Sequence, residues 1–83
     1  MNPDEVRKLL LEQLTVSELF VSGEGSHFEI VAIGDVFQGM RPVQKQQLIY
    51  APLVSYIADG TIHAVNIKTY TDQEWADITP RQD

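Results

Sequence analysis

The chain has 83 residues, a net charge of −6 and no cysteine. A chain this short forms one domain, here residues 1–83, and it can make neither a disulfide nor a thiolate ligand. Its acidic balance disfavours binding to phosphate backbones, and no apolar run approaches the roughly 20 residues that cross a bilayer. Asp4 and Glu5 carry the wrong charge for a secretory signal, so we expect a soluble cytoplasmic protein.

The first predicted element is a helix from Asn2 to Leu14. Asn2 is suited to cap this helix and Pro3 to occupy its first position, and the acidic residues that follow complement the positive helix N-terminus. Apolar side chains then recur at helical spacing and predict one core-facing stripe, formed by Val6, Leu9, Leu10 and Leu14.

A β-hairpin is predicted next, because residues 16–22 and 27–33 are rich in β-branched and aromatic side chains and flank a loop at residues 23–26. Alternation divides the side chains of the second strand into two sets, Phe28, Ile30 and Ala32 on one face and Glu29, Val31 and Ile33 on the other. His27 is therefore expected at the tip or the first rung of the hairpin, within reach of solvent or a partner.

Helical segments are predicted after the hairpin. Residues 36–40 have the composition of a turn or a single helical turn, and a longer helix is expected to begin near Pro42. Pro52 should kink or split this helix, because proline lacks an N–H donor and its ring clashes with the preceding turn. The second piece is expected over residues 53–58, ended by Asp59 and Gly60.

A third strand is predicted from Thr61 to Tyr70, with Ile62, Ala64 and Asn66 facing one way and His63, Val65 and Ile67 the other. The histidine therefore lies near the start of this strand.

A short final helix is predicted from the capping-box pair Thr71 and Glu74, and Trp75 should pack that helix onto the domain. The tail over residues 78–83 is expected to fray. The element order is α-β-β-α-α-β-α, which predicts an α+β fold with helices packed on one face of a three-stranded sheet.

Catalytic motifs are hard to assemble from these residues. Ser26 and His27 could be drawn into a triad, but no nucleophile elbow surrounds the serine, which is better interpreted as a turn residue. The glycines at positions 23 and 25 are followed by no lysine, and Glu24 between them would repel a phosphate. We therefore expect no enzymatic activity.

The turn around Gly39 also has features of a helix-turn-helix, whose second helix would present Gln44, Lys45, Gln46 and Gln47 to bases. The same side chains serve equally well as a solvated helix face. Nucleic-acid binding thus stays an alternative that the acidic charge disfavours.

The two histidines, His27 and His63, are the remaining candidates for chemistry. A lone histidine at a strand end is more often structural than a ligand. If the third strand pairs beside the hairpin in the proper direction, however, the two imidazoles lie within the span of one metal site, and neutral imidazole suits iron, copper and zinc. Two ligands are an incomplete set, which points to donors from a partner protein.

Several motifs together resemble the BolA family, and its short bacterial IbaG branch in particular. These motifs are Phe37-Gln38-Gly39 before a helix, His63-Ala64 near a strand start and Thr71-Asp72-Gln73-Glu74-Trp75 at a helix start. The resemblance extends from about residue 6 to residue 76. It implies a fold similar to a type II K-homology domain, in agreement with the predicted element order.

The resemblance also implies partnership with a monothiol glutaredoxin in a heterodimer that shares a [2Fe-2S] cluster. The glutaredoxin and glutathione would supply sulfur, His63 would match the family's strand ligand, and His27 would match the ligand of its variable loop. None of the cluster would be bound by the isolated chain. From their places in the strand, Lys68 and Tyr70 are expected near His63, where they would either touch the partner or be solvated strand positions.

The implied role is cluster trafficking or iron, redox or stress regulation in the cytoplasm, and the alternative is the transcriptional regulation attributed to some family members. Many of those members carry arginines after the Phe-x-Gly turn, where this chain has Lys45 and glutamines. It also lacks the Gly-x-x-Gly clamp of K-homology domains.

Overall fold

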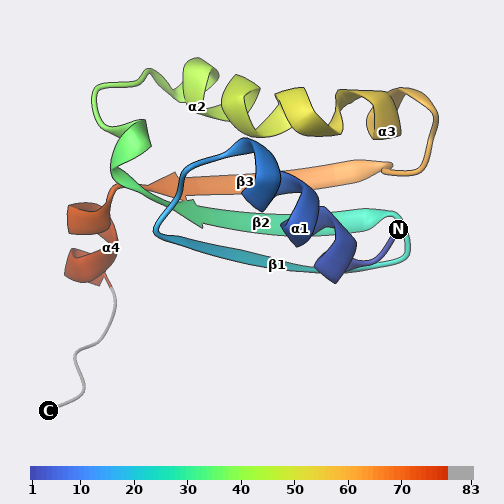
Figure 1. The fold of residues 1–83 in the computed structure, drawn as a ribbon, viewed down its shortest axis with the longest axis horizontal. Helices are drawn as coiled ribbons and strands as arrows, with labels where there is room; N and C mark the ends of the chain where they lie inside the picture. Colours follow the sequence, from blue (N-terminus) through green and yellow to red (C-terminus); the bar gives the residue numbers. More distant parts are fainter. Residues whose placement is uncertain (79–83) are drawn as a thin grey trace, which may run out of the picture.

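Three strands in the order β1-β2-β3 form a mixed sheet in the computed structural model, which describes residues 1–78. Strand β1 (Glu18–Glu24) runs antiparallel to β2 (His27–Ile33), and β3 (Ala64–Tyr70) runs parallel to β2 on its other side (Figure 1). The register pairs Glu24 with His27 across the hairpin and His27 with Ala64 across the parallel ladder. Both β1 and β3 are therefore edge strands around a central β2.

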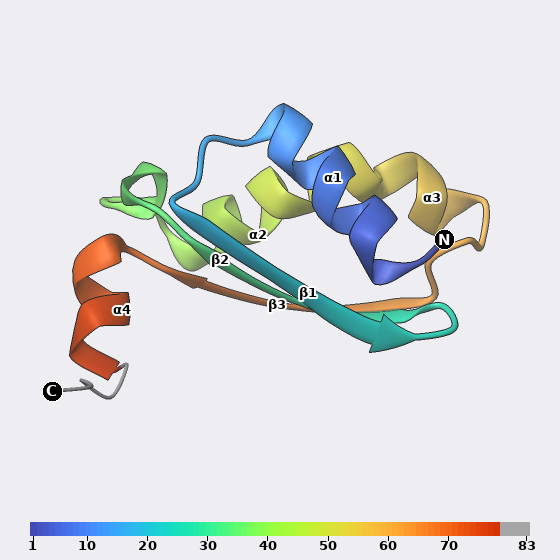
Figure 2. The ribbon, with the colours of Figure 1, turned by 60° about the horizontal axis from the view of Figure 1, so that its bottom comes forward.

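Helices α1 (Pro3–Gln13), α2 (Pro42–Tyr50) and α3 (Val54–Ala58) cover one face of this sheet (Figure 2). Between helices and sheet lies one apolar cluster, made of Val6, Leu10, Leu19, Phe28, Ile30, Ala32, Phe37, Ile49, Leu53, Ile62 and Ile67. The inward residues of β2 are those that the alternation predicts. The predicted α+β arrangement is confirmed, with its core between the sheet and these three helices.

Local signals account for the helix boundaries. The Glu5 N–H donates to Asn2 Oδ1 at 2.8 Å and the Asn2 N–H donates to Glu5 Oε1 at 3.2 Å, so a reciprocal capping box begins α1. Phe37 closes a short 3₁₀ turn, η1 (Asp35–Phe37), and is fully buried. Pro52 lies in a second 3₁₀ turn, η2 (Ala51–Leu53), which separates α2 from α3 as expected.

The hairpin is longer and tighter than predicted. Strand β1 is shifted two residues later than the expected 16–22, and Gly23 and Glu24 pair with Phe28 and His27 instead of forming loop. Glycine at position 23 allows this pairing, because it tolerates a φ of +149° that residues with a Cβ disfavour. The loop therefore contains only two residues.

Strand β3 begins at Ala64, not at the predicted Thr61. The Ile62 N–H donates to the Tyr56 carbonyl at 3.0 Å, and the Thr61 N–H donates to Asp59 Oδ1 at 2.8 Å. These bonds hold the segment against the end of α3 instead of in the ladder. The alternation predicted that Ile62 shares the face of Ala64. Ile62 is instead buried in the core.

The fourth helix, α4 (Asp72–Ile78), lies at the end of the sheet and contacts its other face (Figure 2). The Trp75 ring packs 5.8 Å from Phe20 and 5.4 Å from Tyr70, measured between ring centroids. The predicted docking of Trp75 is thus confirmed, although α4 does not share the face of the other helices. Of the tail that was expected to fray, Ile78 closes α4 and residues 79–83 lie outside the described part.

The predicted capping box of α4 is present. The Thr71 N–H donates to Glu74 Oε1 at 2.8 Å, and the Glu74 N–H donates to Thr71 Oγ1 at 3.1 Å. The backbone hydrogen bond from Thr71 lowers the pKa of Glu74 below its ordinary value of 4.5. This bond therefore stabilises the helix start above that ordinary pKa, and the contribution is lost as the pH falls through the lowered pKa.

We predict that acidification loosens α4 before the core unfolds, since protonated Glu74 is a poorer acceptor for the Thr71 N–H. The single tryptophan, Trp75, reports this as a change in fluorescence during a pH titration. Glu74→Gln keeps an acceptor without titrating, so its acid response should be smaller. An equal response in both proteins would contradict the assignment.

Candidate functional site

The hairpin turn consists of Gly25 and Ser26, directly before the first residue of β2, His27. Gly25 has a φ of +62°, and no residue other than glycine has a positive φ among those described. A positive φ at the first turn position alone fits a type II′ turn, which follows the twist of the flanking strands. The turn lies at the end of the sheet farthest from α4 (Figure 1).

Strand β3 starts beside this turn. The Ser26 carbonyl accepts hydrogen bonds from the His63 N–H at 2.8 Å and from the Ala64 N–H at 3.2 Å. These bonds continue the parallel ladder one step beyond its last pair, His27 with Ala64. They hold the backbone of residue 63 next to a turn that is 37 positions earlier in the chain.

The two imidazoles consequently lie close together. The centroids of the His27 and His63 rings are 6.4 Å apart with an interplanar angle of 50°, and both side chains are exposed. Metal–nitrogen bonds of about 2.0–2.1 Å place two imidazole centres on one ion about 5–6 Å apart. The observed spacing is slightly above that range, and both side chains are exposed, so the two histidines are candidates for a shared metal site.

His63 has a hydrogen-bond partner that the sequence reasoning missed. Ser26 Oγ lies 3.1 Å from His63 Nδ1, which leaves Nε2 as the outward ring nitrogen. From its sequence context alone, Ser26 is interpreted only as a turn residue. One sequence signal points to Ser26 as a site residue: it directly precedes the candidate ligand His27 in a turn.

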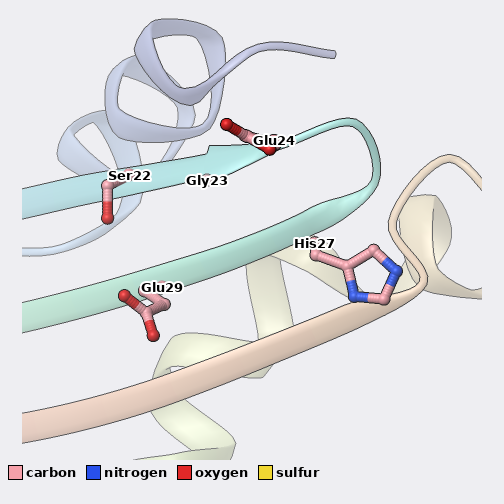
Figure 3. Close-up of a pocket in the computed structure, with 5 residues that line it drawn as sticks. All are labelled: Ser22, Gly23, Glu24, His27 and Glu29. Carbon is pink, nitrogen blue, oxygen red and sulfur yellow. The ribbon is translucent and has the colours of Figure 1, made fainter.

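A shallow pocket borders His27 on the face of the sheet that α1, α2 and α3 leave free. It is lined by Ser22, Gly23, Glu24, His27 and Glu29 (Figure 3). The His27 ring extends toward β3, whereas the Glu24 side chain points away from it (Figure 3). Two carboxylates, those of Glu24 and Glu29, make this pocket acidic.

The donor set of the described residues is incomplete. Within residues 1–78, no group of three or more His, Cys, Asp or Glu side chains is placed to hold a metal ion. Because the full chain has no cysteine, the histidine pair offers nitrogen ligands without sulfur. A metal at this site would need ligands beyond those that residues 1–78 bring together.

The residues predicted to touch a partner lie away from the histidines. Lys68 is exposed and pairs with Val31, and its position four residues beyond Ala64 corresponds to about 13 Å along the strand. Tyr70 is half-buried against Trp75, with ring centroids 5.4 Å apart. The structure does not bring these two residues into the histidine site.

Over residues 1–78, none of the helices combines the length and apolar character that crossing a membrane requires.

Comparison with known proteins defines the class. The family model for BolA-like proteins matches residues 11–74, and the chain belongs to the BolA family. The acid stress protein IbaG of Escherichia coli is 51% identical over 76 residues, covering 92% of this chain and 90% of that protein.

Two further relatives extend the comparison. The DNA-binding transcriptional regulator BolA of Vibrio cholerae is 35% identical over 74 residues, covering 87% of this chain and 69% of that protein. The solved structure of a BolA protein homologue from Coxiella burnetii matches with a TM-score of 0.78 and 28% identity, covering 92% of this chain and 97% of the other. The fold and family expected from the sequence are therefore confirmed.

We predict that Gly23→Ala distorts the hairpin that carries His27. A Cβ at this position would meet the His27 carbonyl and the Phe28 Cα, and the φ of +149° is itself unfavourable for alanine. Gly60→Ala is the matched control, since that glycine has a φ of +85° but open space around its Cβ. Urea denaturation should show a loss of about 1–2 kcal/mol for the control, from backbone strain alone, and a larger loss for Gly23→Ala. Equal losses would show that the close contact is relieved at no cost.

Proposed function

We propose that this protein is a non-enzymatic cytoplasmic adaptor that pairs with a monothiol glutaredoxin and supplies histidine ligands to a shared [2Fe-2S] cluster. Its role would be cluster trafficking or iron and redox regulation. Membership of the BolA family supports this proposal, because partnership with a monothiol glutaredoxin is what the resemblance to that family implies.

The observation that carries the proposal is a pair of exposed imidazoles on a thiol-free chain. The rings of His27 and His63 are 6.4 Å apart at a projecting end of the sheet. Residues 1–78 contain no three-donor metal group to complete the site. An exposed but incomplete nitrogen site suits a metal centre whose other ligands arrive on a second molecule, as the thiols of a glutaredoxin and of glutathione would.

The donor chemistry fits the proposed group. Neutral imidazole is a suitable ligand for iron, and a cluster with imidazole in place of thiolate is less negative and has a higher reduction potential.

The face of the sheet opposite α1–α3 provides room for the partner. It continues from the pocket beside His27 past Lys68, whose charge is exposed on β3. We propose that Lys68 contacts the partner directly. Tyr70 would contribute through its packing with Trp75, which shapes the far end of this face.

We predict that adding this protein to a glutaredoxin that holds a [2Fe-2S] cluster with glutathione changes the visible absorption and circular dichroism of the cluster. His63→Ala should abolish most of the change, because it removes a ligand. His27→Ala should reduce the change, because it removes the second candidate ligand. The measurement is a spectroscopic titration under anaerobic conditions.

Gln13→Ala, an exposed substitution at the end of α1, is the control and should behave as the wild type. A spectrum that the wild-type protein leaves unchanged, or that His63→Ala changes equally, would falsify the ligand role.

Nucleic-acid binding is the second candidate, favoured by the name of the Vibrio cholerae relative as a DNA-binding regulator. The charges of this chain oppose it, since acidic residues outnumber basic ones by twelve to six. Gln46, one of the predicted base-reading side chains, is half-buried and donates from Nε2 to the Ile67 carbonyl at 3.3 Å. This bond attaches the glutamine to the edge of β3.

We therefore predict no retardation of duplex DNA by this protein in a gel-shift assay at physiological salt. A retarded band whose affinity falls steeply with added salt would instead support the regulator function, because phosphate contacts release counterions. In that case, Gln46→Ala would show whether the DNA affinity depends on a base contact of this side chain or on nonspecific attraction to phosphates.

A further inference from the structure

Ser26 is attached to the start of β3 through both its backbone and its side chain. Its carbonyl accepts from the N–H groups of His63 and Ala64, at 2.8 and 3.2 Å. Its hydroxyl oxygen lies 3.1 Å from Nδ1 of the His63 ring, and the residue is half-buried. The hydroxyl is thus held in place by a backbone that the parallel ladder already fixes.

A neutral imidazole has one N–H and one nitrogen lone pair, and the two can exchange positions. When Nδ1 carries the hydrogen, it donates to Ser26 Oγ and the Nε2 lone pair is free to bind a metal. When Nε2 carries the hydrogen, that nitrogen cannot coordinate. The contact between the serine and the ring therefore bears directly on whether His63 is ready to act as a ligand.

We propose that Ser26 is a positioning residue, whose hydroxyl oxygen accepts from His63 Nδ1–H and so holds the ring in the tautomer with Nε2 available to a metal. The metal-binding consequence rests on the proposed function, whereas the tautomer is a property of the isolated chain. A metal-bound histidine almost always donates its other ring N–H to an oxygen acceptor, and Ser26 provides that acceptor before any metal arrives.

The hairpin geometry explains why this task falls to residue 26. The turn has only two residues, and the second of them both ends the turn and faces the residue before β3. Gly25, the first turn residue, has no side chain to offer. His27 belongs to the ladder and is itself a candidate ligand, so Ser26 is the turn residue free to orient His63.

The test begins with the metal-free protein. Nitrogen-15 NMR of the neutral imidazoles distinguishes the two tautomers, because the protonated and the unprotonated ring nitrogen give different shifts. We expect His63 to be mainly Nδ1–H in the wild type and in Ser26→Thr, which keeps the hydroxyl. Ser26→Ala should shift the population toward Nε2–H, and Ser17→Ala, an exposed serine before β1 at the other end of the sheet, should leave it unchanged. The proposal is overturned if His63 is mainly Nε2–H in the wild type, or if Ser26→Ala leaves the tautomer population of His63 unchanged.

A second measurement uses the mixture with glutaredoxin, glutathione and the cluster. Loss of an orienting partner typically weakens metal affinity about 10–100-fold, so Ser26→Ala should weaken the cluster-bound complex by that factor and Ser26→Thr should restore it. A shifted tautomer with unchanged affinity, or no recovery in Ser26→Thr, would overturn the positioning role. If the wild-type mixture forms no shared cluster, the proposed function fails, while the nitrogen shifts of the isolated protein still decide the role of Ser26.

Discussion

Parallel pairing between β2 and β3 is the contact on which the candidate site depends. Parallel strands cannot be joined by a tight turn, so the chain between them must cross over the sheet. Here the crossover contains η1, α2, η2 and α3, and it buries Phe37, Ile49 and Leu53 against the sheet. Core packing of the crossover thereby sets the register that brings residue 63 beside the hairpin turn.

The residues that stabilise the fold are distinct from those of the candidate site. Among the described residues, the buried side chains are apolar and none is polar or charged. The histidines, by contrast, are exposed at one end of the sheet, where the ladder ends. Replacing either histidine there costs little packing, because an exposed side chain contributes few buried contacts. The candidate site thus lies apart from a small core whose stability margin is thin.

Local patterns predicted most of the helices, since helix signals lie within a few residues of one another. Asn2 with Glu5, Thr71 with Glu74, and Pro52 each act on their immediate neighbours, and the structure confirms all three. Strand boundaries were less accurate. The start of β3 was predicted too early because hydrogen bonds from residues 61 and 62 to α3 and its C-terminal turn have no signal in the alternation.

The amino-acid sequence by itself determined the donor types, the absence of thiols, the acidic charge, the helix caps and the inward face of β2. Each of these is a property of single residues or of short spacing. Only the tertiary structure decided that the His27 and His63 rings lie 6.4 Å apart and that Ser26 meets His63 Nδ1. Those contacts join residues 36 or 37 positions apart, and their distances depend on ladder register and crossover packing, which no local pattern contains.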